Sequence, residues 1–227
     1  MILATLSRTA SIARPSIAAL RSQRQQFPQL RAVSMFSFLD RFKESKSARK
    51  VKPIAGLRIY EQIADQIDYP SFFHRYNMPN TYNSWFLVTE LHVWMTLTRV
   101  MAIEDAGRKL RSGVVETMWT DATQRAKRIQ SDNPSMMRKQ LNVLSQQFQA
   151  ALITYDDGLM HDDKSMATSL WVRFFDKKCE DYENLSVLVE YVRRQIQMLE
   201  RIPDEEFLDN PKIEWEKITD LKVSHMN

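Results

Sequence analysis

The stretch WFLVTELHVWMTLTRVM, residues 85–101, is the most apolar segment of this 227-residue chain and decides its fold class. It is seventeen residues long and contains Glu90, His92 and Arg99. A membrane-spanning helix needs about 20 predominantly apolar residues, and a charged residue near the bilayer centre costs about 2.5–3.5 kcal/mol. We therefore predict that the segment is the buried central helix of a bundle and not a membrane span.

Apolar residues elsewhere in the chain recur at steps of three and four, which places them on one face of a helix. The stripes are Tyr60, Ile63 and Ile67; Val115, Met118, Trp119, Ala122, Ala126 and Ile129; Met137, Leu141, Leu144, Phe148, Ala151 and Tyr155; Met166, Leu170, Trp171 and Phe174; and Leu185, Leu188, Val192, Ile196 and Leu199. The chain has only four glycines, whereas sheets and phosphate-binding loops depend on glycine for turns. The sequence predicts an all-α fold, a single compact domain of about six to seven helices.

Residues that favour helix ends occur between these stripes. Asn133 before Pro134 is typical of an N-cap followed by proline in the first turn. Asp162 or Asp163 is expected to cap the helix through Trp171, and Asn184 the helix through Leu199. We expect Pro70 and Pro203 to end helices, and Gly107, Gly113 and Gly158 to lie at helix ends that need left-handed backbone.

The first 39 residues differ from the rest of the chain. They contain five arginines and no acidic residue, with serine, threonine and apolar residues between them. This composition is typical of a mitochondrial transit peptide, and we expect residues 1–39 to be such a leader, disordered and without a packed fold. A disordered basic tail that binds an anionic partner is the alternative.

The positive charge of the chain belongs to its first part. The whole chain has 32 basic and 28 acidic residues, but the part after Lys52 has 21 basic and 26 acidic residues. We expect a basic linker over residues 40–55, a helical domain over residues 56–202 and a C-terminal tail over residues 203–227. The acidic balance of the domain argues against a DNA-binding role.

The most enzyme-like feature is the acidic string from Asp156 to Asp163, YDDGLMHDD over residues 155–163. Four aspartates and His161 could bind a hard metal ion, but the spacing is not that of an EF-hand. A turn between helices with a capping aspartate uses the same residues and is the favoured interpretation. The single cysteine, Cys179, excludes a disulfide framework.

Two polar residues in the apolar stretch need partners. Glu90 and His92 would point roughly 200° apart on a helix, so they cannot share a ligand. A buried carboxylate is unfavourable unless it is paired, so we expect Glu90 to meet a basic residue or to line a groove. Arg173 and Arg193 are both candidates for that partner.

Three basic clusters lie on the predicted helices, at residues 108–111, 125–128 and 138–139. They could form one face for RNA or acidic lipid. Solvated helix faces are the more common explanation.

Several of these strings together resemble the ubiquinol–cytochrome c chaperone family. The likeness rests on YNSWFLVTELHVWM (82–95), YDDG (155–158), LWVRFF (170–175) and LVEYVRRQI (188–196), and it covers about residues 56–201. It implies an all-α protein on the matrix side of the mitochondrial inner membrane, with peripheral membrane contact. The implied role is that of a chaperone that binds newly made cytochrome b with a small complex III assembly factor and is linked to the mitochondrial ribosome.

The resemblance also gives candidate partner-binding residues. The positions that match the family's two motifs, and that we take as candidate partner-binding residues, are Trp85, Glu90, His92, Trp94, Trp171, Arg173 and Phe174. No catalytic residue, cofactor or metal ligand follows from the family, so we expect a chaperone and not an enzyme. The rival hypotheses are a helical matrix enzyme with a metal site at Asp156–Asp163, and an RNA- or ribosome-associated scaffold that uses the basic clusters.

Overall fold

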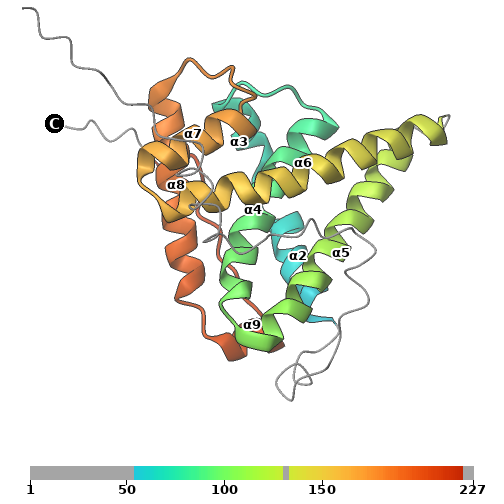
Figure 1. Ribbon diagram of the computed structural model, residues 1–227, viewed down its shortest axis with the longest axis vertical. Coiled ribbons are helices and arrows are strands. Elements are labelled where there is room, and N and C mark those ends of the chain that lie inside the picture. The colour runs from blue at the N-terminus through green and yellow to red at the C-terminus, as the bar shows by residue number, and fades with distance from the viewer. Residues whose placement is uncertain (1–53, 130–132, 222–227) are drawn as a thin grey trace, which may run out of the picture. The chain divides into compact units, whose positions relative to one another are not determined.

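The computed structural model of the chain describes residues 54–129 and 133–221, and it leaves out the side chains of residues 104 and 105. The expected leader and all but the end of the expected linker lie outside the described residues. Within the described ranges the chain forms eight helices and no strand, which confirms the all-α prediction (Figure 1). The helices are α2 (Ala55–Gln66), α3 (Tyr69–Arg75), α4 (Tyr82–Met101), α5 (Glu104–Ile129), α6 (Pro134–Met160), α7 (Asp163–Arg173), α8 (Tyr182–Glu200) and α9 (Asp204–Asp209).

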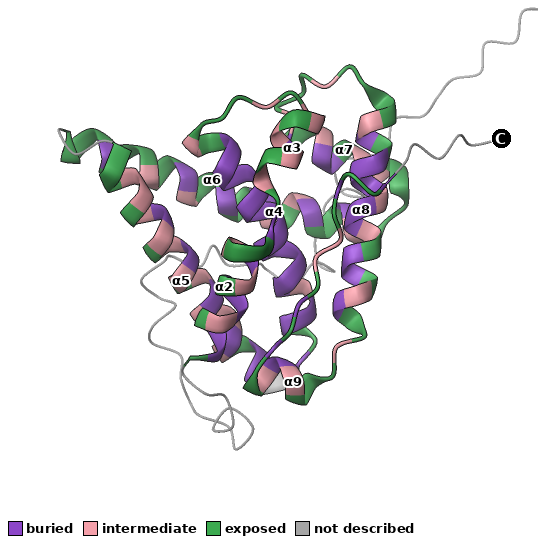
Figure 2. Ribbon diagram, turned by 180° about the vertical axis from the view of Figure 1, so that it is seen from behind, coloured by how far each residue is buried: buried purple, intermediate pink, exposed green. Residues whose placement is uncertain are grey.

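Helix α4 lies at the centre of the fold, as the apolar stretch predicts. Every side chain from Ser84 to Leu97 is buried, and α2, α3, α5, α6 and α8 all contact the helix. The helix begins where the Thr81 hydroxyl oxygen accepts a hydrogen bond from the Ser84 amide at 3.3 Å. Figure 2 shows the surrounding helices turning their buried faces inward and their exposed faces to solvent. Among the described residues, no helix is long and apolar enough to cross a bilayer.

The predicted stripes of α6 and α8 form the inner faces of those helices. On α6 the buried stripe residues are Met137, Leu144, Phe148, Ala151 and Tyr155; on α8 they are Leu185, Leu188, Val192, Ile196 and Leu199. The stripe of α5 does not stay buried to its end, because Ile129 is 65% exposed. The last turns of α5 and the first turns of α6 project beyond the other helices, so no other helix covers them (Figure 1).

The expectation that glycines mark helix ends is wrong. Gly107 and Gly113 lie inside α5, Gly158 lies inside α6, and no described glycine has a positive φ angle. Close contact between helices is the reason for glycine at two of these positions. A Cβ atom on Gly158 would come within 2.7 Å of the Ser169 hydroxyl oxygen on α7. Gly113 allows α5 to pass directly over Gly56 of α2.

Two of the expected caps are confirmed. The Met136 amide donates to the Asn133 side chain at 3.1 Å, and the Ser165 amide donates to Asp162 at 2.9 Å. The expectation for Asn184 is wrong, because α8 begins earlier. Its cap is Asp181, which accepts a hydrogen bond from the Asn184 amide at 2.9 Å.

The role expected for Pro70 is also wrong. Helix α2 ends at Gln66, and Pro70 is the second residue of α3. Proline is accepted in a first turn because the amide that it lacks would have no partner within the helix. Pro203 follows the end of α8 at Glu200, as expected, and directly precedes α9.

The segment after α8 packs back onto the domain. Its buried residues are Phe207, Ile213, Ile218 and Leu221. Arg75 on α3 donates to the backbone oxygens of Ile218 and Leu221 at 3.1 and 3.2 Å. The Trp215 ring lies 4.9 Å from the His92 ring, edge to face. The described part of the C-terminal tail therefore contributes to the same core as the helices before it.

The crossing of α2 and α5 yields a stability prediction. In Gly56→Ala, the new Cβ would lie 2.6–2.8 Å from backbone atoms of Gly113 and Val114, so the helices must move apart. We expect this overpacking to lower the free energy of unfolding by about 1–3 kcal/mol, as measured by denaturant titration. The control is Gly113→Ala, whose Cβ would meet the Gly56 Cα at 3.3 Å. It should cost less, and the reverse order would contradict this account of the crossing.

Candidate functional site

The most buried charged group of the described chain is Glu90, in the middle of α4. Its side chain is 0% exposed. The Arg173 guanidinium, at the end of α7, donates from Nε and Nη2 to the two carboxylate oxygens at 2.7 and 2.6 Å. The expected basic partner of Glu90 is therefore present, and it is Arg173. This two-pronged geometry is the strongest form of a charged hydrogen bond between side chains.

The surroundings of the ion pair change the pKa of Glu90. Burial raises the pKa of Glu90 to about 7, although the hydrogen bonds and the charge of Arg173 act in the opposite direction. The Tyr155 hydroxyl is buried close to the pair and has no hydrogen-bond partner among the described residues. Burial raises the pKa of that hydroxyl well above its usual value, and the charge of Glu90 raises it further.

Trp94 lies one helical turn after Glu90 on the same face of α4. Its ring lies 4.9 Å from the Tyr155 ring, and its indole nitrogen donates to the Asp156 carboxylate at 2.8 Å. Asp156 itself is exposed. The motif on α4 and the acidic string at the end of α6 are thus joined by a direct hydrogen bond.

Arg193, the other candidate partner of Glu90, is used elsewhere. From α8 it donates to the Asp163 carboxylate at 3.0 Å, and to the backbone oxygens of Leu159 and His161 at 3.1 and 2.9 Å. These bonds satisfy backbone oxygens at the C-terminal end of α6 that no longer have a partner in the helix. Arg193 therefore ties α8 to the turn between α6 and α7.

His92 faces the other side of α4 and makes a separate network. Its Nδ1 lies 2.7 Å from the Val88 backbone oxygen and its Nε2 lies 2.7 Å from the Tyr191 hydroxyl. The first contact requires a proton on Nδ1, so Nε2 accepts from the tyrosine. Complete burial lowers the pKa of His92 to about 4. The side chain is neutral at physiological pH, and Glu90 and His92 share no ligand, as their spacing predicts.

The remaining candidates lie in the core or at its edge. Trp85 is 9% exposed, and the Arg125 guanidinium lies over its ring at 4.5 Å. Phe174 is 3% exposed. Trp171 is half-buried, and its indole nitrogen donates to the Cys179 backbone oxygen at 3.1 Å. Of the seven candidates, Trp171 and Arg173 are partly exposed and the other five are buried, and both of these residues belong to the last turn of α7.

The acidic string forms the end of α6 and the start of α7. Asp162 caps α7, and the His161 ring nitrogen contacts the Asp157 backbone oxygen at 2.7 Å. Within residues 54–129 and 133–221 there is no group of three or more histidine, cysteine or acidic side chains that could hold a metal ion. The geometry there is that of the capped turn that the sequence favours.

Sequence reasoning missed the role of Arg99. It is 8% exposed, near the end of α4, and it donates to the backbone oxygens of Leu199 and Ile202 at 3.2 and 2.6 Å and to the Asp204 carboxylate. Its guanidinium also lies 5.1 Å from the centre of the Phe207 ring. The available signal was a charged residue in an otherwise apolar helix, which indicates a buried partner.

Comparison with known proteins places this core in a family. Residues 74–215, which include α4, α7 and α8, match the family model described as ubiquinol-cytochrome C chaperone. The chain belongs to this family. It is a family of assembly chaperones and not of enzymes.

Two of three relatives of the chain are named as assembly factors. The chain is 50% identical over 169 residues to ubiquinol-cytochrome c reductase complex assembly factor 1 of Drosophila melanogaster, an alignment that covers 73% of this chain and 65% of that protein. It is 40% identical to the Homo sapiens protein of the same name, over 75% of this chain and 56% of that protein. With Protein CBP3, mitochondrial, of Saccharomyces cerevisiae, the identity is 27%, over 74% and 56% of the two chains. The chain thus spans less than two thirds of the length of each of these relatives.

A solved structure supports the fold of the family member described here. The crystal structure of the Cbp3 homolog from Brucella abortus superposes with a TM-score of 0.62 at 18% identity. The match covers 78% of this chain and 96% of that chain. The name of the yeast relative gives a mitochondrial location for that protein.

The buried ion pair yields a pH-dependent prediction. Arg173→Met leaves the Glu90 carboxylate buried without a charged partner, which costs about 3–5 kcal/mol of unfolding free energy near pH 8. Burial holds the pKa of Glu90 in the folded protein above the value of about 4.3 in the unfolded chain, and loss of Arg173, which lowers that pKa, raises it further. The stability that depends on a neutral carboxyl is complete below about pH 4.3 and is lost as the pH rises, over a wider pH range in the variant than in the native chain. The loss should therefore be smaller at pH 5 than at pH 8 in denaturant titrations.

The double variant Glu90→Gln with Arg173→Met is the control for that experiment. It has no carboxylate at this position, so its stability relative to the native chain should not show the additional loss between pH 5 and pH 8. A single Arg173→Met variant with the same loss at both pH values would contradict the assignment.

The neutral histidine yields the opposite pH dependence. The pKa of His92 is lower in the folded protein than the value of about 6.5 in the unfolded chain, so the stability it contributes is present above pH 6.5 and lost as the pH falls toward 4. We expect the stability difference between the native chain and His92→Gln to shrink by about 1.4 kcal/mol per pH unit over that range. Tyr191→Phe removes the hydrogen bond without a group that titrates there, so its loss should be constant. A constant difference for His92→Gln would refute the neutral, buried state.

Proposed function

We propose that the chain is an assembly chaperone of the mitochondrial cytochrome bc1 complex, complex III, that binds newly synthesised cytochrome b and supports its translation and stabilisation. The observation that carries the proposal is the 50% identity, over 169 residues, to a protein named as an assembly factor of that complex. In this proposal the chain works on the matrix side of the inner membrane with peripheral membrane contact, together with a small complex III assembly factor and near the mitochondrial ribosome.

The packing of the candidate residues divides their proposed roles. Glu90, His92 and Trp94 are fully or almost fully buried, so they act by holding α4 against α7, α8 and the end of α6. Arg173 and Trp171 reach the surface, beside Val172, which is 37% exposed. We propose the last turn of α7 as the part of the motif that a partner touches.

This mode of action needs no chemical step. An apolar helix of cytochrome b leaves the ribosome without its final neighbours, and shielding it prevents aggregation. Release then follows from exchange of partners, because a protein without a nucleotide cycle changes its complexes through differences in affinity.

The proposal is tested by capture of the tagged chain from gently solubilised mitochondria during active mitochondrial translation. We expect cytochrome b and a small assembly factor to be recovered with the native chain. Val172→Glu places a charge at the proposed contact surface and should reduce the recovery of cytochrome b at least about tenfold. Its melting temperature should not change, since Val172 is partly exposed.

Ile129→Glu is the matched control. It makes the same kind of substitution at a site that is 65% exposed, at the far end of α5, and it should leave the recovery of cytochrome b unchanged. If neither cytochrome b nor an assembly factor is recovered with a folded native chain in mitochondria, the proposed function is wrong. Equal recovery with Val172→Glu and the native chain would instead exclude α7 as the contact surface.

A further inference from the structure

The outer face of α6 carries large apolar side chains that the described chain leaves uncovered. Met136 is 52% exposed, Val143 47%, Ile153 61% and Met160 75%. The buried stripe of the same helix, from Met137 to Tyr155, lies on the opposite face and fills the core. Helix α6 therefore carries large apolar side chains on its outer face as well as on the face that fills the core, and the described domain covers only the latter.

The exposed face has the spacing of a coiled-coil seam. Its residues alternate steps of three and four, as the a and d positions of a heptad do. They are Met136, Lys139, Val143, Gln146, Ala150, Ile153, Asp157 and Met160, and all of them are exposed. We call this set the α6 seam. A seam of this kind lies along the facing side of two paired helices.

The middle of α6 also lacks charge. Residues 140–155 contain no acidic or basic side chain, although a solvated helix face ordinarily carries many. Depletion of charged residues is the compositional mark of the centre of a protein interface. The face is therefore suited to contact with protein and not to a polyanion such as RNA, which requires basic residues.

The α6 seam is complementary to itself when two copies run antiparallel. When position 148 of the two copies coincides, a seam residue before that position faces the residue of the other copy that lies equally far after it. The facing pairs are Met136 with Met160, Lys139 with Asp157, Val143 with Ile153, and Gln146 with Ala150. A two-fold interface requires pairs of this kind. If residue i of the first copy contacts residue j of the second, then residue j of the first copy also contacts residue i of the second. Met136, Val143, Ile153 and Met160 meet apolar partners, Gln146 meets the small Ala150, and the two charged positions meet each other.

The charged pair also selects the direction of the two helices. The Asp157 side chain is 70% exposed, and its described ionic neighbour is His161 at 3.7 Å, within the same helix. Lys139 has no ion-pair partner among the described residues. Antiparallel pairing sets Lys139 against Asp157 of the second copy at both ends of the seam. Parallel pairing would oppose like charges, which is unfavourable.

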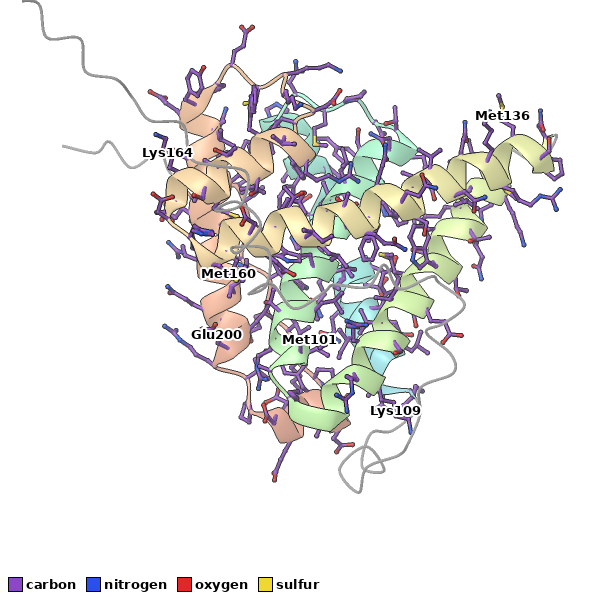
Figure 3. All side chains as sticks on the ribbon, viewed as in Figure 1. Met101, Lys109, Met136, Met160, Lys164 and Glu200 are labelled. Carbon is purple, nitrogen blue, oxygen red and sulfur yellow. The ribbon has the colours of Figure 1, made fainter. Side chains whose placement is uncertain are left out.

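We propose that the chain forms a homodimer in which the α6 seams of two copies pair antiparallel. In Figure 1 α6 crosses in front of α4, and Figure 3 labels Met136 and Met160 near its two ends, so the length between them is the proposed interface. The inference goes beyond the proposed function and does not depend on it, because the occupant of the surface is the chain itself.

The test measures the mass of the purified full chain in solution by light scattering and sedimentation over a range of concentrations. We expect a dimer for the native chain. Lys139→Glu and Asp157→Lys each oppose like charges at both ends of the seam and should weaken the dimer at least about tenfold. The double variant with both substitutions restores opposite charges and should return to the native dimer. Lys212→Glu, an exposed position on the C-terminal segment, is the control and should dimerise as the native chain does.

A cross-linking experiment checks the direction of the helices. In a Cys179→Ser background, a chain with Val143→Cys and Ile153→Cys should form disulfide-linked dimers under mild oxidation, because the two positions face each other in the antiparallel pair. Val143→Cys alone should not, since the two copies of that position are then about ten residues of helix apart, or ~15 Å.

Three results would overturn the proposal. A native chain that is monomeric at every concentration excludes it, including the case in which a different protein is found on the α6 seam. A dimer that is insensitive to both charge reversals excludes this seam as the interface. Efficient cross-linking of Val143→Cys alone excludes the antiparallel arrangement. A far-UV circular dichroism spectrum like that of the native chain excludes misfolding as the cause of any loss, since a weaker dimer by itself lowers the melting temperature.

Discussion

The pairing of Glu90 with Arg173 is the constraint on which the rest of the structure depends. Helix α4 is buried on all sides, so each polar group on it must find a partner inside the protein. Arg173 can reach Glu90 only when the end of α7 lies against the middle of α4. The turn between α6 and α7 must in turn hold α7 there, and Arg193 from α8 fastens that turn. The Glu90 carboxylate thus fixes α7 against α4, and the bonds of Arg193 add α8 to the same arrangement.

The other polar groups of α4 repeat this logic along its length. His92 meets Tyr191 of α8, Trp94 meets Asp156 of α6, and Arg99 reaches the end of α8. Apolar contacts supply most of the stabilisation, but they allow one helix to shift along another. A hydrogen bond between two defined residues does not allow such a shift, because its distance and angle ranges are narrow. The hypothesis that such buried polar groups select one arrangement over others has support in some proteins. In this chain it would account for the single arrangement of the helices around α4, whose buried polar groups are paired with α6, α7 and α8.

The sequence predicts the secondary structure and the centre of the fold well, because helical periodicity and low glycine content are local properties. It predicts the caps Asn133 and Asp162 for the same reason, since a cap bonds within its own turn. It fails for Gly158, whose role is to let another helix approach, and such a neighbour lies outside any local pattern. The sequence also leaves open whether Arg173 or Arg193 is the partner of Glu90, because the answer depends on contacts between distant segments.

The sequence by itself determined that the chain is helical, that residues 85–101 are its core and that its motifs are those of a chaperone family. These properties follow from the order and type of residues, which a linear pattern records. Only the tertiary structure decided that most of the motif residues hold helices together beneath the surface, and that α6 keeps a second apolar face outward. Burial and partner choice depend on which distant segments meet in space, and a stripe of apolar residues looks the same whether its neighbour belongs to its own domain or to another molecule.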